Sequence, residues 1–245
     1  MGAMRGFLEA VSFLTIIPVA RAGMKPGPGS LGWLPAVGLL LGCVWGCFDL
    51  LSGYLFSPGL RALVDVLFLI LLTGGLHLDG LADTADGLFS RRGREEALRI
   101  MKDSRIGTWG VLALVLVLGL KTLALLDLPQ QGRFLSLLLV PAYGRLSMLV
   151  GLRLLPYGRG QEGIAHDLIA GSGGPHWIWW AGILLLGSLA LGWPEALLLN
   201  LAFGLVLLGC LSLYSSRMGC ITGDMAGALG EITETGMLVA LSVRL

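Results

Sequence analysis

Three aspartates crowd one short stretch of the sequence, residues 74–87, which reads GGLHLDGLADTADG. Asp79, Asp83 and Asp86 are four and three residues apart, so on a helix they lie within roughly 60° of one another. Three carboxylates on one narrow face repel each other, and oxygen ligands at this spacing suit a hard cation such as Mg²⁺. The pattern therefore predicts a divalent-cation site of the kind that Mg²⁺ shares with substrate phosphates.

An alternative interpretation is a solvated acidic loop that is balanced by the arginines after it. The histidine of this stretch, His77, lies about 160° from Asp79 on a helix, away from the acidic face. It is interpreted as a buried histidine, a proton carrier or, if the helix breaks at Gly80, a ligand. Gly80 and Gly87 are expected to leave room for a bulky ligand near the backbone. The helical spacing favours the cation site over the solvated loop.

Basic side chains follow in EEALRIMKDSRIGTWG, residues 95–110, which is predicted to be a short amphipathic helix and a glycine turn. Lys102, Asp103 and Arg105 are candidates for phosphate binding, because arginine can hold phosphate oxygens bidentately. The competing interpretation is anchoring to anionic lipid. Arg159, in LLPYGRGQEG, is equally a phosphate ligand or a topology signal.

Two further charged positions lie within apolar runs. Arg145 is costly inside a membrane unless it is functional or paired. Asp224 and Glu231, in TGDMAGALGEITE, are seven residues apart and share a helix face, so they either complete the metal site or hold Arg145. The small residues between them predict a tightly packed helix. Thr222 is alternatively a helix cap, which explains Asp224 but not Glu231.

Composition predicts the framework that positions these residues. The chain of 245 residues is 55% hydrophobic and 13% charged, whereas soluble domains carry about 25% charged residues. The predicted fold class is all-α: one polytopic membrane domain, residues 1–245, with about seven transmembrane helices and a retained interfacial or short buried helix within residues 1–22. Cys43 and Cys47, four residues apart in an apolar run, are expected to be buried small hydrophobes and not zinc ligands. The candidate spans are residues 31–56, 60–76, 107–126, 134–155, 177–193, 195–214 and 225–243.

Charge in the connections predicts the orientation. With seven spans, the polar segments 77–106, 156–176 and 215–224 fall on one side together with the N-terminus. That side carries twelve basic residues and the other carries four, so the polar segments and the chemistry are expected in the cytoplasm. The four residues assigned to the far side are Arg61, Lys121, Arg133 and Arg244.

Four motifs, in this order and spacing, closely resemble the cobalamin synthase family: GGLHLDGLADTADG, IMKDSRIGTWG, LLPYGR and TGDMAGALGEITE. The resemblance runs from Phe13 to Glu234. It implies a cell-membrane (inner-membrane) enzyme that joins adenosylcobinamide-GDP to α-ribazole, or its 5′-phosphate, and releases GMP with Mg²⁺ as cofactor. A more distant likeness is to CDP-alcohol phosphotransferases. The sequence departs from the family at Ile16, where a basic residue is common, and after Gly163, where His166 and Asp167 stay unassigned.

The resemblance implies roles for the candidate residues. Asp79, Asp83 and Asp86 would hold one or two Mg²⁺ ions on the diphosphate, and Asp86 or Asp83 would accept the proton of the attacking hydroxyl. The expected partners are the two substrates and the lipid bilayer, with no nucleic acid, and a homodimer is expected only by analogy with distant relatives. An ion-coupled transporter is the alternative from another class. Its path would use Asp65, Arg145, Asp224 and Glu231.

Overall fold

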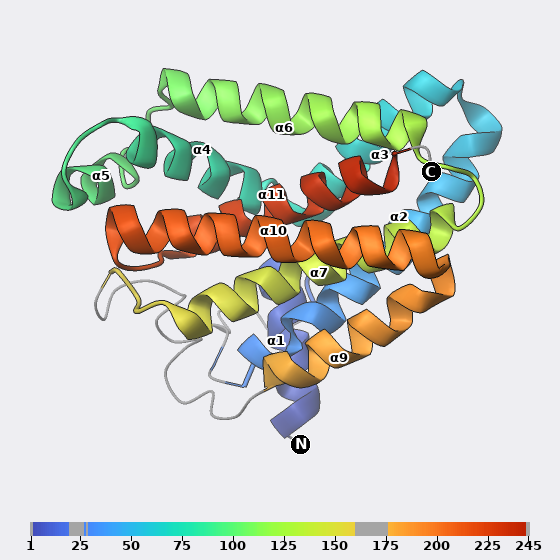
Figure 1. Ribbon diagram of the computed structural model, residues 1–245, viewed down its shortest axis with the longest axis horizontal. Coiled ribbons are helices and arrows are strands. Elements are labelled where there is room, and N and C mark those ends of the chain that lie inside the picture. Colours follow the sequence, from blue (N-terminus) through green and yellow to red (C-terminus); the bar gives the residue numbers. More distant parts are fainter. Residues whose placement is uncertain (1, 20–26, 28, 160–175, 244–245) are drawn as a thin grey trace.

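The computed structural model describes residues 2–19, 27, 29–159 and 176–243, and this part of the chain is a bundle of helices without a β-strand (Figure 1). The predicted all-α class is confirmed. Arg21, Lys25 and Arg244 of the charge count lie outside the described residues, as do His166 and Asp167.

Every predicted apolar span corresponds to a helix, and the predicted N-terminal helix is present as α1. Two short 3₁₀ turns, Leu31–Trp33 and Leu189–Leu191, precede α2 and follow α9. The helices are α1 (Gly2–Leu14), α2 (Leu34–Leu55), α3 (Pro58–Thr73), α4 (Leu76–Phe89), α5 (Arg94–Ile100), α6 (Thr108–Asp127), α7 (Arg133–Leu154), α9 (His176–Ser188), α10 (Trp193–Met218) and α11 (Gly223–Leu241).

Four helical segments within the described residues are long and apolar enough to cross a membrane: Leu31–Leu55, α6, α7 and α10. Helices α3 and α4 together would make a fifth, although they are bent by 93°. Helices α9 and α11 are not among these segments. The bundle is therefore that of a multi-pass membrane protein, with some of its helices short or buried.

Helices α7 and α11 form the centre of the bundle, and glycines allow the close packing. A Cβ on Gly38 of α2 would lie 2.5 Å from the Pro141 carbonyl oxygen of α7. A Cβ on Gly144 of α7 would lie 2.8 Å from Cγ of Glu234 on α11. Small residues allow such close backbone contact in lipid, where helices gain little from hydrophobic burial against each other. The predicted tight packing of the last helix is confirmed.

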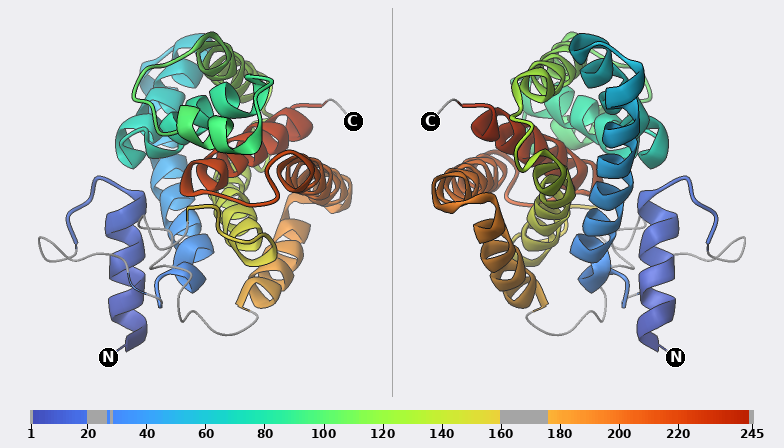
Figure 2. Two further views of the ribbon diagram at one scale, coloured as in Figure 1. Left: turned by 90° about the vertical axis from the view of Figure 1, so that its left-hand side faces the viewer. Right: turned by 90° about the vertical axis from the view of Figure 1, so that its right-hand side faces the viewer.

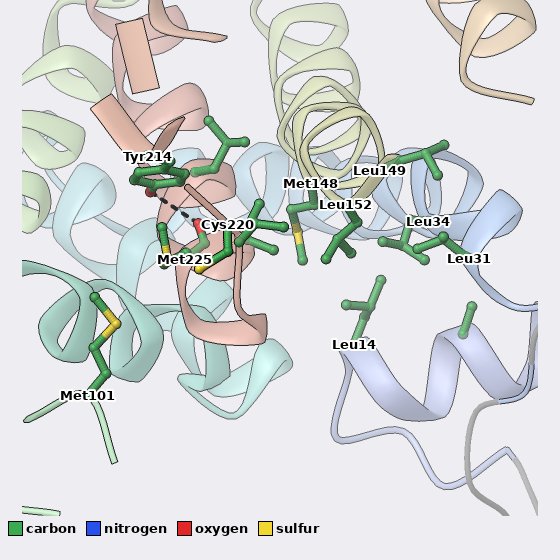
Figure 3. Packing of buried hydrophobic residues seen from close by; sticks show 14 of the residues in the cluster. Leu14, Leu31, Leu34, Met101, Met148, Leu149, Leu152, Tyr214, Cys220 and Met225 are labelled. Atoms are coloured by element: carbon green, nitrogen blue, oxygen red, sulfur yellow. Dashed lines mark hydrogen bonds between the residues drawn. The ribbon is translucent and has the colours of Figure 1, made fainter. Parts of the chain in front are cut away.

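A hydrophobic cluster joins the N-terminal helix to the centre of the bundle (Figure 3). Leu14 of α1 and Leu34 of α2 belong to it with Met148 of α7. The Tyr214 hydroxyl of α10 donates a hydrogen bond of 3.1 Å to the Met225 carbonyl oxygen, which fixes the start of α11 against α10. This contact holds the first turn of α11 in place.

The expectation that Cys43 and Cys47 are buried is wrong. Cys220 is buried and Cys210 is partly buried, but Cys43 and Cys47 are exposed on the surface of α2. In a membrane bundle the outward face of a helix meets lipid, so apolar side chains are stable on it without burial in protein.

Two glycines redirect the chain between α3 and α4. Gly74 and Gly75 have φ of 64° and 69°, a left-handed conformation that costs glycine little. Their N–H groups donate to the carbonyl oxygens of Leu71 and Ile70, which ends α3. Helix α4 then starts in a new direction and carries the three aspartates along α6 and α11 (Figures 1 and 2).

The described polar connections gather at one end of the bundle, whereas the N-terminus, which was predicted to share their side, lies at the bottom of Figure 1. The α4–α5–α6 connection, the C-terminus of α7 and the α10–α11 turn all lie at the left of Figure 1. The far-side basic residues differ from expectation, because Lys121 and Arg133 are buried and Arg61 is half-buried in ion pairs. All three form ion pairs with carboxylates inside the bundle.

Candidate active site

The predicted acidic face of α4 is present, because residues 76–89 are one uninterrupted helix. Asp79 is exposed at this face, and Asp83 and Asp86 are half-buried. Asp83 lies within electrostatic reach of Asp79, Asp86 and Asp224, with Arg159 as the one cation among these neighbours. Four carboxylates and one guanidinium therefore share this end of the bundle.

Close packing of α4 on α11 brings Asp224 to the acidic face. A Cβ on Gly80 would lie 2.8 Å from the carbonyl oxygen of Asp224, so only glycine permits the approach. Gly87 likewise faces Met101 and the Ala97 carbonyl oxygen. The expectation that Gly80 and Gly87 make room for a ligand is wrong. Both make room for neighbouring helices, since α4 must pack on two sides.

A short backbone bridge places Arg159 over the start of α11. Gly158 N–H donates to the Ile221 carbonyl oxygen at 2.9 Å, and Ile221 N–H donates to the Pro156 carbonyl oxygen at 2.9 Å. Arg159 then forms an ion pair with Asp224. Both side chains keep about a fifth to a quarter of their surface exposed, so the pair is open to solvent.

The capping role considered for Thr222 is confirmed, since its hydroxyl oxygen accepts from Met225 N–H at 3.2 Å. Capping fixes Asp224 in the first turn of α11, near the positive end of the helix dipole. The α11 dipole and Arg159 both compensate the Asp224 carboxylate in part.

The Asp86 carboxylate is engaged by the start of α6. Its Oδ2 accepts from Gly107 N–H at 2.7 Å and its Oδ1 from Gly110 N–H at 2.9 Å. The carboxylates of Asp79 and Asp83, in contrast, make no hydrogen bond or ion pair with any residue that the structure describes. Of the three aspartates on α4, these two are available to a ligand.

The loop before α6 carries the predicted phosphate-binding side chains. An open hollow of about 340 Å³ is lined by Arg99, Ile100, Lys102, Asp103 and Arg105. At its surface, Arg105 Nη2 lies 2.6 Å from Asp103 Oδ2. The hydrogen bonds from Arg105 to the Asp103 carboxylate lower its pKa to about 2, so Asp103 is ionised at neutral pH.

Arg145 and Glu231 belong to a second, interior cluster rather than to the acidic face. Lys121 Nζ lies 2.5 Å from Glu231 and 2.8 Å from Glu234, and Arg145 pairs with the other oxygen of Glu234. All four side chains are buried. The structural ion pair considered for Arg145 is present. Its partner is Glu234, which the spacing of residues along the chain did not predict.

His77 lies in the interior, as the helix geometry predicts, and is buried against Gly227 of α11. Its Nε2 is buried without a hydrogen-bond partner among the described residues. Its electrostatic neighbours are Arg145, Glu231 and Lys121, all from the interior cluster. His77 therefore packs beside that cluster and not with the aspartates.

Arg153 is a cation that the sequence motifs did not single out. It lies in the last turn of α7, six residues before Arg159. Its Nε and Nη2 are buried and have no hydrogen-bond partner in the part of the chain that the structure describes. Nε and Nη2 form one edge of the guanidinium, the edge that binds an oxyanion bidentately. In the sequence, the feature that could have identified Arg153 is its position near the end of an apolar run.

The carboxylates fit a hard cation only in combination with other ligands. Among the described residues, no three His, Cys, Asp or Glu side chains are grouped closely enough to enclose a metal ion. Mg²⁺ rarely needs such a cage, because it is bound by one or two carboxylates with water and substrate phosphates. Asp79 and Asp83 supply oxygen ligands that no other described group engages.

The side chains expected to line an ion path lie in separate clusters. Asp65 is buried near the opposite end, 3.1 Å from the Ser52 hydroxyl and 3.7 Å from Arg133. Glu231 is held by Lys121, and Asp224 by Arg159. Paired groups in three places do not support a continuous transport path.

The fold and the site together define a class: a multi-pass helical membrane protein with an acidic, arginine-containing site at its polar end. Residues 6–242 match the family model described as cobalamin-5-phosphate synthase. The chain belongs to this family.

Several relatives match over nearly their whole length, and each is named adenosylcobinamide-GDP ribazoletransferase. The protein of Acetivibrio thermocellus is 37% identical over 242 residues, which cover 98% of each chain. That of Ectopseudomonas mendocina is 41% identical and covers 96% of this chain and 98% of its own. That of Brevibacillus brevis is 36% identical, with 97% and 98% covered. No solved structure matches.

Proposed function

We propose that this chain is an adenosylcobinamide-GDP ribazoletransferase. It would join adenosylcobinamide-GDP to α-ribazole, or to α-ribazole 5′-phosphate, and release GMP. The observation that carries the proposal is the meeting of Asp79, Asp83 and Asp224 with Arg159 at one end of a bundle. Near full-length similarity to relatives of that name supports the choice of substrate.

We propose Mg²⁺ as the cofactor, held by Asp79 and Asp83, with Asp224 beside them. Bound Mg²⁺ would neutralise negative charge on the diphosphate during displacement. Both aspartates are on one helix face, and their mutual repulsion favours a cation between them. Glu231, an earlier candidate ligand, is engaged by Lys121 in the interior, so we propose a structural role for it.

Basic side chains would bind the phosphate oxygens. Arg159 lies directly beside the acidic face through its pair with Asp224. Lys102 and Arg105 line the open hollow on the loop before α6, which a GDP group would reach from solvent. Arg153 adds buried donors near the end of α7. These side chains would orient the diphosphate and stabilise its charge as a bond breaks.

The carboxylate of Asp83 is the best-placed proton acceptor. The attacking ribazole hydroxyl oxygen would form a bond to the phosphorus on the cobinamide side while the bond from that phosphorus to the GMP oxygen breaks. The hydroxyl proton would pass to Asp83, which is half-buried and whose carboxylate has no hydrogen-bond partner among the described residues. Asp86, the other candidate base, has both oxygens engaged by backbone N–H groups.

We further propose that the polar end faces the cytoplasm, as the excess of basic residues in its loops favours. The membrane would be the cell (inner) membrane, and the catalytic unit would be the single domain. A homodimer stays an expectation from analogy.

The test uses the full chain purified in detergent and supplied with adenosylcobinamide-GDP, Mg²⁺ and either α-ribazole or its 5′-phosphate. We expect equimolar GMP and cobalamin product, measured by chromatography, and no product when a chelator replaces Mg²⁺. Failure to release GMP with either acceptor would contradict the proposal. Formation of a product from a CDP-alcohol by the same preparation would favour the phosphotransferase alternative instead.

A further inference from the structure

We infer that Asp86 is a positioning residue: its carboxylate fixes the start of α6 and, with it, the loop that carries Lys102 and Arg105. The catalytic consequence of this inference rests on the proposed function, whereas the contact itself does not. The role differs from metal binding or proton transfer, which the spacing of the three aspartates alone suggests for Asp86.

The first turn of α6 lacks the side chains that usually complete a helix start. Gly107 is the capping residue, with extended backbone angles and no side-chain hydrogen bond. In a capping box, the side chain of the cap binds the N–H of the third helical residue, and that residue's side chain binds the N–H of the cap. Here the third residue is Gly110. Both positions are therefore glycine, and both N–H groups need an acceptor from elsewhere.

Asp86 supplies both missing acceptors from α4. One carboxylate oxygen takes the N–H of the cap, Gly107, at 2.7 Å, and the other takes the N–H of Gly110 at 2.9 Å. The negative charge also lies at the positive end of the α6 dipole. The Asp86 side chain thus makes both of the contacts that two separate side chains make in a capping box.

The two glycines are required by space. A Cβ on Gly110 would lie 2.5 Å from Asp86 Oδ2, and a Cβ on Gly107 would collide with Asp86 Oδ1. The φ of Gly107 is −94°, which any residue adopts, so backbone freedom is not the reason for glycine there. Alanine at either position would displace the carboxylate without changing a charged group.

The loop before α6 is held at both ends by neighbouring residues of α4. Met101, at its start, is buried against Gly87, and Gly107, at its end, is held by Asp86. Lys102 and Arg105 lie between these two anchors. Adjacent anchors on the helix that carries Asp83 fix where the cationic loop lies relative to the acidic face.

The first measurement tests the contact without requiring activity. Hydrogen–deuterium exchange of the amides from Gly107 to Val111 is compared in detergent for the wild type, Asp86→Ala and Asp83→Asn. We expect at least about tenfold faster exchange in Asp86→Ala, because two bonds to a charged acceptor are lost. Asp83→Asn, a change on the same helix without that contact, should exchange as the wild type does. Equal exchange in all three proteins would overturn the inference.

The second measurement separates positioning from metal binding. In Asp86→Ala, KM for adenosylcobinamide-GDP should rise about tenfold, while the Mg²⁺ concentration that gives half-maximal GMP release stays within twofold of the wild type. Asp86→Asn should recover part of the KM, since its amide oxygen can still accept one N–H. A Mg²⁺ requirement that rises tenfold or more in Asp86→Ala would identify a metal ligand and overturn the positioning role.

Gly107→Ala keeps the inference testable if Asp86→Ala does not fold. It removes no charge, and we expect the same faster exchange and the same rise in KM. A Gly107→Ala protein with wild-type exchange and KM would contradict the inference. If the wild type releases no GMP, the proposed function fails, and the exchange measurement still decides whether Asp86 holds α6.

Discussion

Two clusters of charged side chains lie in the same bundle, and they differ in how their charge is balanced. In the interior cluster, Lys121 and Arg145 meet Glu231 and Glu234, so two cations face two carboxylates out of contact with solvent. At the end of α4, the electrostatic neighbours of Asp83 are three further carboxylates and one cation, Arg159, and the site is partly open. The first cluster is complete by itself, and the second has an excess of negative charge.

The difference follows from the cost of burying charge. An uncompensated charge in the interior costs several kcal/mol, so interior ions must be paired within the protein. A site in contact with solvent can leave part of its charge to be balanced by a bound cation. Helix α11 shows both cases, because Asp224 at its first turn joins the open site and Glu231 two turns deeper joins the buried pairs. Net charge, rather than the presence of acids, separates the candidate active site from the scaffold.

The largest effect is expected from Asp83→Asn in the open site. The change keeps the size of the side chain but removes the negative charge and the proton acceptor, so GMP release should fall about 10²–10³-fold. The melting temperature in detergent should stay the same or rise, because repulsion among the carboxylates is relieved. Near wild-type turnover at saturating Mg²⁺ would contradict the role of the acidic face.

Substitutions in the interior cluster should lower the stability of the fold. Glu234→Ala leaves both Lys121 and Arg145 without this shared partner, and it should destabilise the fold by about 3–5 kcal/mol. Thermal unfolding in detergent measures the loss. Glu231→Ala is the matched control, since Glu231, among the described residues, forms an ion pair with Lys121 alone and its loss should cost less. The distinction between cluster and site fails if Glu234→Ala unfolds like the wild type.

A smaller effect is expected at Arg153, where stability and activity should change in opposite directions. Arg153→Leu removes buried donors that have no partner among the described residues, so the melting temperature should rise slightly. KM for adenosylcobinamide-GDP should rise about tenfold, the equivalent of 1.4 kcal/mol of lost binding. An unchanged KM, measured by GMP release over a substrate series, would show that Arg153 does not bind the substrate.

The smallest effect is expected at the surface pair of Asp103 and Arg105. Hydrogen bonds from Arg105 lower the pKa of Asp103 to about 2, so the stabilisation is complete above the ordinary pKa near 3.8 and is lost as pH falls towards 2. Asp103→Asn should therefore leave the shape of the pH profile between pH 5 and 9 unchanged. Its KM should change less than threefold, whereas a tenfold change would place Asp103 in direct contact with substrate.

Several features of this protein could be predicted from residue types and from their spacing along a helix. Long apolar runs predicted the helices, because membrane helices must satisfy their backbone internally and cover about 30 Å of hydrocarbon. The spacing of Asp79, Asp83 and Asp86 predicted one helix face, and it also predicted that His77 points elsewhere. The cap at Thr222 was readable for the same reason, since capping is local. Each of these depends on neighbours within a few residues of the chain.

Partners from distant parts of the chain were decided only by the tertiary structure. Glu234 pairs with Arg145, 89 residues away, and with Lys121, which the charge count had assigned to the far side of the membrane. Asp86 binds the start of α6 although its spacing groups it with Asp83. Gly80 and Gly87 face helices instead of a ligand. Sequence specifies which side of a helix a residue occupies, but the element that packs against that side depends on how all the helices fit together.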